Sequence, residues 1–246
     1  MKYLRLFEDF ESHDPYELMI IPPNKKAEMI VDEFKKGKPN LNLIHDLIVL
    51  GANVNWQDEN KYNYTPLHFA VRDELTKIAR MLIDGGADVN LQDEDGHTPL
   101  HTAVVRKNIK IVRMLIDAGA DVNRRTKAGS TPLYRAVQFG KVEFARMLID
   151  AGADVNLQNR NGETPLHVVI IHNRVEPSRI LIEAGADVNV QTNDGYTPLH
   201  WAAIKGNEEI PQMLIDAGAR TDIKDFYGNT PYDYAKFDEL KNLLQT

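Results

Sequence analysis

Hydrophobic and polar positions follow one pattern that returns every 33 residues between positions 65 and 229. Each period holds a short apolar stretch, a polar break, a longer apolar stretch such as Met81-Leu82-Ile83, and a glycine followed by polar residues. The two apolar stretches predict two short helices, and the residues after the glycine predict an extended finger. The chain is therefore predicted to repeat a unit of helix, turn, helix and finger.

The first helix of each period begins with a Thr-Pro-Leu-His phrase or a close copy of it. The phrase starts at Thr65, Thr98, Thr131, Thr164 and Thr197. In the copy at Thr131 the histidine is replaced by Tyr134, and a degenerate copy starts at Thr230. Threonine is a good N-cap because its hydroxyl accepts a backbone N–H of the first turn. Proline suits the next position, where its missing N–H would have no partner within the helix.

A second phrase, Gly-Ala-Asp-Val-Asn, starts 21 residues after the threonine of each period. It starts at Gly86, Gly119, Gly152 and Gly185, and a last copy from Gly218 reads Gly-Ala-Arg-Thr-Asp. The glycine is predicted to end the second helix in the left-handed conformation, which glycine adopts without a steric penalty.

A fixed period of 33 residues with Thr-Pro-Leu-His at one phase is the sequence signature of the ankyrin repeat. The chain resembles the ankyrin repeat protein family over residues 25–246. The resemblance implies an all-α fold, an ankyrin-repeat solenoid of stacked helix-turn-helix units with extended finger loops.

The periodic pattern divides the chain into four predicted parts. They are an N-terminal segment outside the period (1–23), a degenerate N-terminal capping repeat (24–64), five full repeats (65–229) and a C-terminal capping half-repeat (230–246). Terminal repeats are atypical because one of their sides faces water. In the degenerate repeat we expect one helix at Ala27–Lys36 and another at Leu41–Leu50.

The N-terminal segment carries apolar residues at the spacing of one helical face, namely Tyr3, Leu6, Phe7 and Phe10. Three interpretations stay open: a helix that packs on the first repeat, a short motif held by another protein, and a disordered segment. Pro22-Pro23 is expected to break any helix and to mark the boundary.

Two prolines fall in the first turns of second helices, Pro177 and Pro211. Proline is tolerated near the start of a helix but not deep inside it. We therefore expect these two helices to begin late or to bend.

The composition narrows the possible partners. Hydrophobic residues make up 43% and charged residues 26%, which is ordinary for a folded protein. The formal net charge is −7, so non-specific attraction to nucleic acid or an anionic membrane is not expected. The chain has no cysteine, which fits a reducing compartment. Its apolar runs are too short for a membrane span, and no Sec-type signal peptide is expected.

Two groups of residues suggest a metal site at first sight. The four phrase histidines share one phase: His68, His101, His167 and His200. Stacked helices lie about 8–10 Å apart, so neighbouring histidines are not expected to share a zinc ion, and the resemblance implies a hydrogen-bonding role instead. The acidic stretch ending at Gly96 does not match an EF-hand, because its glycine comes at position 4 instead of 6. No metal and no cofactor are expected.

Catalytic motifs give no support for an enzyme. The chain contains no P-loop, no G-x-S-x-G, no H-E-x-x-H and no kinase-like set of motifs. Carboxylates recur at repeating surface phases, so they do not single out a catalytic pair. We expect a protein without enzymatic activity.

The resemblance also implies that the finger tips and the ends of the first helices line a concave groove that binds partners. Carried over by phase, the expected partner-binding residues are Tyr64, Arg72, His97, Arg106, Phe139, His172, Tyr196 and Trp201. Aromatic and arginine residues are the types enriched at interface hot spots.

The function implied by the resemblance is a non-enzymatic module for protein–protein interaction, with an unknown protein as its partner. Two alternatives stay open: an inhibitor or adaptor of one specific enzyme, and a nucleic-acid-binding scaffold. Basic fingers near Arg124 and Arg160 favour the second alternative, and the acidic finger at Asp93 opposes it. We expect a monomer in the cytoplasm, with secretion into a host cell left open.

Overall fold

The computed structural model describes residues 15–206 and 208–245 of the 246-residue chain. The described residues form fifteen helices and no strand, which confirms the predicted all-α fold. The chain divides into two compact units, unit 1 (Met1–Ala120) and unit 2 (Asp121–Thr246), and each is described by itself. Tyr3, Leu6, Phe7 and Phe10 lie outside the described residues.

Unit 1 has two rows of helices. Its described elements are α1 (Pro15–Met19), α2 (Pro23–Phe34), α3 (Leu41–Val49), α4 (Pro66–Arg72), α5 (Thr76–Asp84), α6 (Pro99–Arg106) and α7 (Ile109–Asp117). The first helices of the repeats, α2, α4 and α6, pack in one row, and the second helices, α3, α5 and α7, pack in the other.

Unit 2 repeats this arrangement and ends in two short helices. Its elements are α8 (Pro132–Gln138), α9 (Val142–Asp150), α10 (Pro165–Ile171), α11 (Val175–Glu183), α12 (Pro198–Lys205), α13 (Glu209–Asp216), α14 (Pro231–Tyr234) and α15 (Asp238–Leu244). First helices α8, α10, α12 and α14 form one row, second helices α9, α11 and α13 form the other, and α15 packs on α14.

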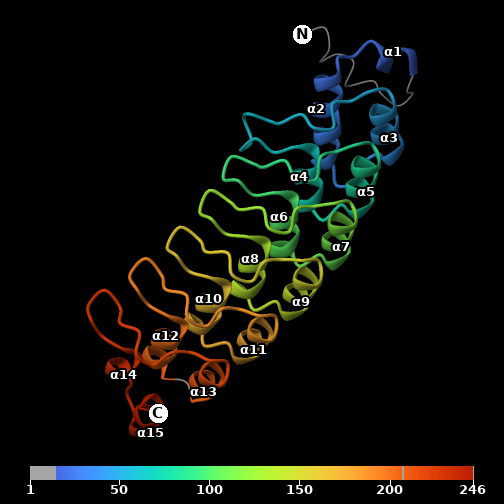
Figure 1. The fold of residues 1–246 in the computed structure, drawn as a ribbon. Coiled ribbons are helices and arrows are strands. Elements are labelled where there is room, and N and C mark those ends of the chain that lie inside the picture. Colours follow the sequence, from blue (N-terminus) through green and yellow to red (C-terminus); the bar gives the residue numbers. More distant parts are fainter. Residues whose placement is uncertain (1–14, 207, 246) are drawn as a thin grey trace. The chain divides into compact units, whose positions relative to one another are not determined.

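A finger leads from each second helix to the next first helix, and Figure 1 shows the fingers on the side of the first helices away from the second helices. We call a finger, the first helix after it and the following turn a finger segment. The finger segments are 56–75 and 91–108 in unit 1, and 124–141, 157–174 and 190–206 in unit 2, where a last finger (223–229) leads to α14. A second helix and the turn after it form an outer segment: 76–90 and 109–120 in unit 1, and 142–156, 175–189 and 208–222 in unit 2.

The predicted signals start and end the helices. The Thr65 hydroxyl accepts the backbone N–H of His68 at 3.2 Å, so it satisfies a donor that the first turn of α4 leaves unpaired. Gly86 follows α5 with φ of 88°, the left-handed conformation predicted for it. Alanines of the first helices are fully buried where neighbouring helices approach closely: Ala70, Ala103, Ala136 and Ala202.

Two sequence-based expectations about helix starts were wrong. α2 begins at Pro23, before the predicted Ala27, because a proline at the first helical position fixes a helical φ and loses no hydrogen bond. α11 begins at Val175, the phase at which α9 begins, so Pro177 does not delay it. α13 begins at Glu209, one residue later than the phase of the other second helices, which agrees with the expectation for Pro211. Pro177 and Pro211 are each the third residue of their helix, where the N–H would be unpaired in any case.

No described helix combines the length and the apolar character that crossing a membrane requires. The boundaries of the four predicted parts stay a prediction.

Candidate functional site

The histidine of the Thr-Pro-Leu-His phrase fastens a first helix to the next finger. In unit 1 the backbone N–H of Thr65 donates to Nδ1 of His68 at 3.2 Å, and Nε2 of His68 lies 3.1 Å from the carbonyl oxygen of His97. Because Nδ1 accepts, the ring proton belongs on Nε2, which donates to that carbonyl. Burial lowers the pKa of His68, so the ring stays neutral in this network.

The same link recurs in unit 2. Nε2 of His167 lies 3.2 Å from the carbonyl oxygen of Tyr196, and Nε2 of His200 lies 3.2 Å from that of Asn229. Burial lowers the pKa of His167 to about 4. The hydrogen-bonding role implied for these histidines is confirmed. Among the described residues no group of three or more His, Asp or Glu side chains is placed to hold a metal ion.

Tyr134 replaces the histidine in one repeat and makes the link in another way. Its hydroxyl donates to the Glu163 carboxylate at 3.2 Å and accepts from Nδ2 of Asn159 at 2.9 Å. Burial, with the nearby charge of Glu163, raises the pKa of Tyr134 to about 12. A neutral phenol therefore joins α8 to the next finger.

Asp93 has a structural role in its finger. Its Oδ1 accepts the backbone N–H groups of Asp95 at 3.0 Å and His97 at 2.7 Å, a side-chain turn typical of aspartate. Burial alone would raise the pKa of Asp93, but the hydrogen bonds from His97 outweigh it and lower the pKa. The acidic stretch that resembles a calcium loop is thus a finger turn.

Side-chain amides join the fingers of unit 2 to one another. Nε2 of Gln158 donates to the carbonyl of Gly162 at 2.8 Å within its own finger and to that of Gln191 at 3.1 Å in the next. Arg125 takes this place one finger earlier, where its Nη2 donates to the carbonyl of Gln158 at 2.6 Å. These bonds hold the backbone of neighbouring fingers in one register.

In unit 1, Phe69 brings two of the predicted site residues together. The ring of Tyr64 lies edge-on to Phe69 at 5.4 Å and stacks on His68 at 5.5 Å. The Arg72 guanidinium lies 5.0 Å from the centre of the Phe69 ring and pairs with Asp73, with 2.7 Å between Nε and Oδ1. Both Tyr64 and Arg72 are half-buried and already engaged.

The other two predicted site residues of unit 1 differ in exposure. His97 is half-buried, with its ring edge-on to His101 at 5.7 Å and its Nδ1 3.5 Å from the Asp93 carboxylate. Arg106 is the exposed last residue of α6. Of the four, Arg106 has the side chain most open to a partner.

In unit 2 the structure brings Tyr196 and Trp201 together. Their rings lie 5.3 Å apart, and the Tyr196 hydroxyl lies 3.3 Å from that of Tyr234. Nζ of Lys205 lies 6.0 Å from the centre of the Trp201 ring. Tyr196 and Trp201 are half-buried, so one part of each side chain packs within unit 2 and another part is accessible to a partner.

Phe139 and His172 occupy equivalent positions, one residue past the ends of α8 and α10. Both are exposed, and the Phe139 side chain is 49% exposed. Nζ of Lys141 lies 5.9 Å from the centre of the Phe139 ring. Phe139 contributes little to the interior and is the most accessible of the predicted aromatic residues.

Sequence reasoning missed two further features of the finger side. Phe226 and Tyr227, at the tip of the last finger, are each 75% exposed. They were detectable, because other repeats have polar residues such as Asn193 and Asp194 at that phase. Arg174 was also missed: its guanidinium lies where a side chain on Gly140 would be, a contact that no local pattern encodes.

Exposed apolar side chains separate the two sides of the repeats. Between residues 56 and 229 of the described chain, every exposed large hydrophobic side chain lies in a finger segment or in the last finger. They are Tyr62, Val105, Phe139, Phe226 and Tyr227. Exposed apolar side chains that gather on one side of a protein are a mark of interaction sites, and within residues 56–229 they lie on the finger side.

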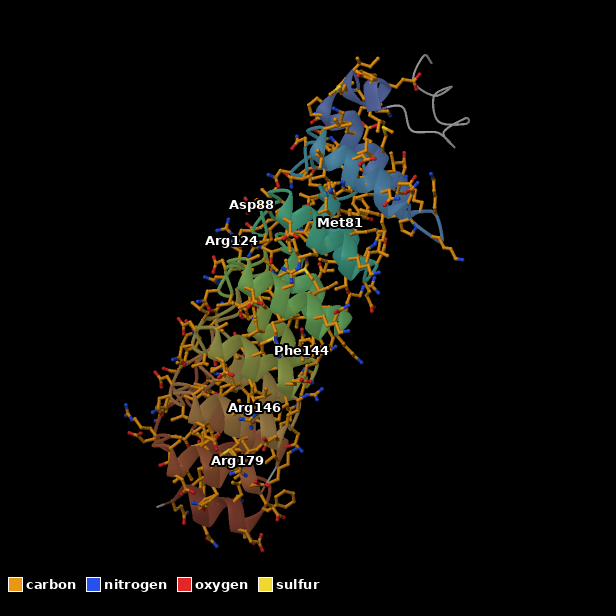
Figure 2. All side chains as sticks on the ribbon, turned by 90° about the vertical axis from the view of Figure 1, so that its right-hand side faces the viewer. Met81, Asp88, Arg124, Phe144, Arg146 and Arg179 are labelled. Atoms are coloured by element: carbon orange, nitrogen blue, oxygen red, sulfur yellow. The ribbon has the colours of Figure 1, made fainter. Side chains whose placement is uncertain are left out.

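The outer helices of unit 2 carry paired charges instead. Figure 2 shows Arg146 and Arg179 one after the other along this surface. Arg146 pairs with Glu176 at 3.1 Å, and Arg179 pairs with Glu209 at 2.6 Å. These ion pairs join α9, α11 and α13 across their exposed faces.

Comparisons with known proteins agree with this geometry. The family model described as "Ankyrin repeats (3 copies)" matches residues 35–126, 133–225 and 179–243. The crystal structure of the ankyrin repeat domain of Bcl-3, described as a unique member of the IkappaB protein family, aligns with a TM-score of 0.78 and 27% identity. That alignment covers 92% of this chain and 99% of the other.

A curated relative matches over a shorter stretch. It is the putative ankyrin repeat protein R664 of Acanthamoeba polyphaga mimivirus, 40% identical over 58 residues, which are 22% of this chain and 36% of the viral protein. The match thus spans about a third of the relative's length. A stack of helix pairs whose histidines and fingers link each repeat to the next defines a class of repeat protein, and this chain belongs to the ankyrin-repeat family.

Proposed function

We propose that this chain is a non-enzymatic interaction module that binds a partner protein through its finger side. Ankyrin repeats are in general modules for protein–protein interaction. The observation that carries the proposal is that, between residues 56 and 229 of the described chain, the exposed large apolar side chains all lie in the finger segments and the last finger. We further propose that it acts inside a cell as a monomer.

A rigid finger side favours binding because little order must be imposed when a partner arrives. The hydrogen bonds of His167 and Gln158 fix the backbone of the fingers before any partner is present. Phe139 projects from this scaffold without a role in the interior, so its exposed ring is available to a partner. Arg106 and His172 offer exposed polar contacts of the same kind.

The test is a direct measurement with a partner isolated from the native host by affinity purification and then purified itself. Replacing Phe139→Ala is expected to weaken binding about thirtyfold, the loss of roughly 2 kcal/mol that marks a hot spot. The melting temperature should hardly change, since the ring is exposed. Calorimetry gives the affinity, and thermal unfolding monitored by circular dichroism gives the stability.

The matched controls lie on the outer side. Lys110 and Glu143 are exposed in α7 and α9, and reversing either charge should leave the affinity nearly unchanged. Tyr196→Ala and Trp201→Ala are expected to lose both affinity and stability, because both rings pack within unit 2. If Lys110 or Glu143 variants abolish binding while Phe139→Ala does not, the partner binds the outer side and the proposal fails.

A further inference from the structure

The finger segments of unit 2 carry an excess of positive charge in a chain whose formal net charge is −7. Segments 124–141, 157–174 and 190–206 together hold eight Lys or Arg and two Asp or Glu. The outer segments of the same unit hold three Lys or Arg and ten Asp or Glu. The two sides of unit 2 therefore have opposite charge, and its finger side attracts anionic groups.

Ion pairing differs between the two sides as well. The basic residues of the outer segments are all paired: Arg146 with Glu176, Arg179 with Glu209 and Arg220 with Asp222. In the part of the chain that the structure describes, several basic residues of the finger segments form no ion pair. They are Arg124, Lys127, Arg160, Arg174 and Lys205. These unneutralised cations are available to a ligand, whereas the outer cations are not.

Arg174 is held in a defined place at the end of α8. A Cβ on Gly140 would overlap its guanidinium, and its Nη2 lies 3.5 Å from the carbonyl oxygen of Gln138. The positive φ of 64° does not by itself require glycine at this turn, because Lys107 and Asn173 adopt 64° and 54° at the same phase. Because Gly140 has no side chain, the Arg174 guanidinium has room to lie over the backbone at this turn.

Aromatic rings accompany the cations. Lys141 lies beside the exposed ring of Phe139, and Lys205 lies beside Trp201. Among the described residues the buried Nε1 of Trp201 has no hydrogen-bond partner. Such a surface matches a ligand that presents carboxylates together with apolar side chains, since the carboxylates pair with the cations and the apolar groups cover the rings.

We propose that the finger segments of unit 2 bind an acidic segment of the partner protein, rich in Asp and Glu and carrying at least one large apolar residue. This inference rests on the proposed function and names the chemistry of the partner. Arg174 and Lys205 pair with its carboxylates, and Phe139 and Trp201 receive its apolar side chain. The segment is extended, because the cations are distributed over three successive repeats.

The net charge favours an acidic peptide over the two other polyanionic occupants. A nucleic acid extends far beyond three repeats and would face the repulsion of the whole −7 chain, whereas a short segment meets mainly the local cations. A second copy of this chain would bring the same overall negative charge. An acidic segment of another protein gains the attraction with the least repulsion.

The experiment selects binders from a display library of random short peptides against the full chain. Enriched sequences are expected to be rich in Asp and Glu with a Phe, Trp or Leu among them. A fluorescent synthetic copy then gives the affinity by anisotropy. Arg174→Gln with Lys205→Gln is expected to weaken its binding about tenfold. Lys127→Gln with Arg160→Gln, both on exposed finger tips, should also weaken it and keeps the test valid if the first variant folds poorly.

The matched control is Lys61→Gln with Lys107→Gln, which removes two exposed cations from the finger segments of unit 1 and should leave the affinity unchanged within about twofold. Enriched peptides without an acidic excess, or equal losses in the control, overturn the inference. Single-stranded DNA that binds these residues more tightly than the peptide, or a dimer that the peptide dissociates, overturns it too. If neutral peptides are enriched and Phe139→Ala still abolishes their binding, the inference fails while the proposed function stands.

Discussion

Unit 1 and unit 2 are built on the same scaffold but differ in the chemistry of their finger segments. The finger segments 56–75 and 91–108 of unit 1 hold four Lys or Arg and seven Asp or Glu, whereas those of unit 2 hold eight and two. The histidine links are the same in both, as His68 and His167 show. The part of the sequence that repeats builds the scaffold, and the part that varies sets the surface.

Two half-buried arginines, Arg72 of unit 1 and Arg174 of unit 2, also differ in their surroundings. In unit 1, Arg72 is bound by Asp73 and packs over Phe69, so its charge is neutralised within the repeat. In unit 2, Arg174 and Lys205 form no ion pair among the described residues. Together with the charge counts, this difference indicates that the finger side of unit 2 attracts an anionic partner more strongly than the finger side of unit 1 does. Changes in the two units should therefore differ in their effects as the surfaces and contacts of the units do.

The largest effect is expected from deleting residues 230–246, which cover one end of unit 2. The deletion removes Leu240 and Leu244, both buried, and should cost unit 2 roughly 3–6 kcal/mol at the usual value for burying two leucine side chains. Array stability depends on nearest-neighbour interfaces, so unit 2 should unfold before unit 1. Trp56 reports on unit 1 and Trp201 on unit 2, and urea titrations of the single-tryptophan variants measure each separately.

The control for this deletion is the full chain carrying the same single-tryptophan substitutions. Coincident transitions of Trp56 and Trp201 in the shortened chain, at the midpoint of the full chain, would show that residues 230–246 do not cap unit 2.

The second effect is a loss of stability in acid, which His167 should cause and Tyr134, at the same phase of its repeat, should not. The pKa of His167 is about 4 in the folded chain, below the value of about 6.5 for a free histidine, so the unfolded chain binds the proton more tightly. The free energy of unfolding should therefore fall as the pH falls through this window, by roughly 3 kcal/mol for this residue. Below the folded pKa this contribution is fully lost.

The measurement compares urea midpoints of the full chain and of His167→Gln at a series of pH values. The variant should be less stable at neutral pH but should lose less stability on acidification. Tyr134→Phe, a change at the same phase without a titrating histidine, should keep the acid slope of the full chain. If the urea midpoint of His167→Gln depends on pH as steeply as that of the full chain, this histidine does not cause the loss of stability in acid.

The third effect concerns the packing of Arg174 against Gly140. Gly140→Ala should destabilise unit 2 by about 1–3 kcal/mol, because the added methyl overlaps the guanidinium and a non-glycine residue must adopt a positive φ. In an Arg174→Ala background the same change should cost less, since the overlap is gone. The double-mutant cycle isolates that coupling. Additive costs would mean that Gly140 serves only the turn.

The smallest effect is expected from Tyr134→Phe, which removes one hydroxyl. Glu163 and Asn159 keep the 2.7 Å hydrogen bond between them, so the loss should be about 1 kcal/mol. Spectrophotometric titration supplies a second check: the variant should lose a tyrosine that ionises only near pH 12. If the variant loses a tyrosine that ionises near pH 10, Tyr134 is not bound as described.

Much of the fold was predictable from the sequence because its determinants are local. Thr65 and Pro66 start a helix, and Gly86 ends one, through contacts within a few residues. The wrong expectation for Pro177 arose from an uncertain helix start: once the helix begins at Val175, the proline is in the first turn and costs nothing. α2 began early for the same reason, with Pro23 as its first residue.

The candidate site was predictable only in part because it depends on contacts between repeats. Phase alone placed Phe139 and Arg106 on the surface correctly. It could not show that Tyr64 and Tyr196 are largely engaged with rings that follow them in the chain. Nor could it show Arg174 lying over Gly140, a contact across 34 positions that depends on the exact packing of α8 and α10.

The central claim is that the partner occupies the finger side of unit 2, and hydrogen exchange with mass spectrometry tests it most directly. The full chain is compared alone and saturated with its purified partner. The account predicts slower exchange in segments 124–141, 157–174 and 190–206, with little change in the outer segments. Protection confined to the outer segments 142–156 and 175–189, or to unit 1, would contradict it.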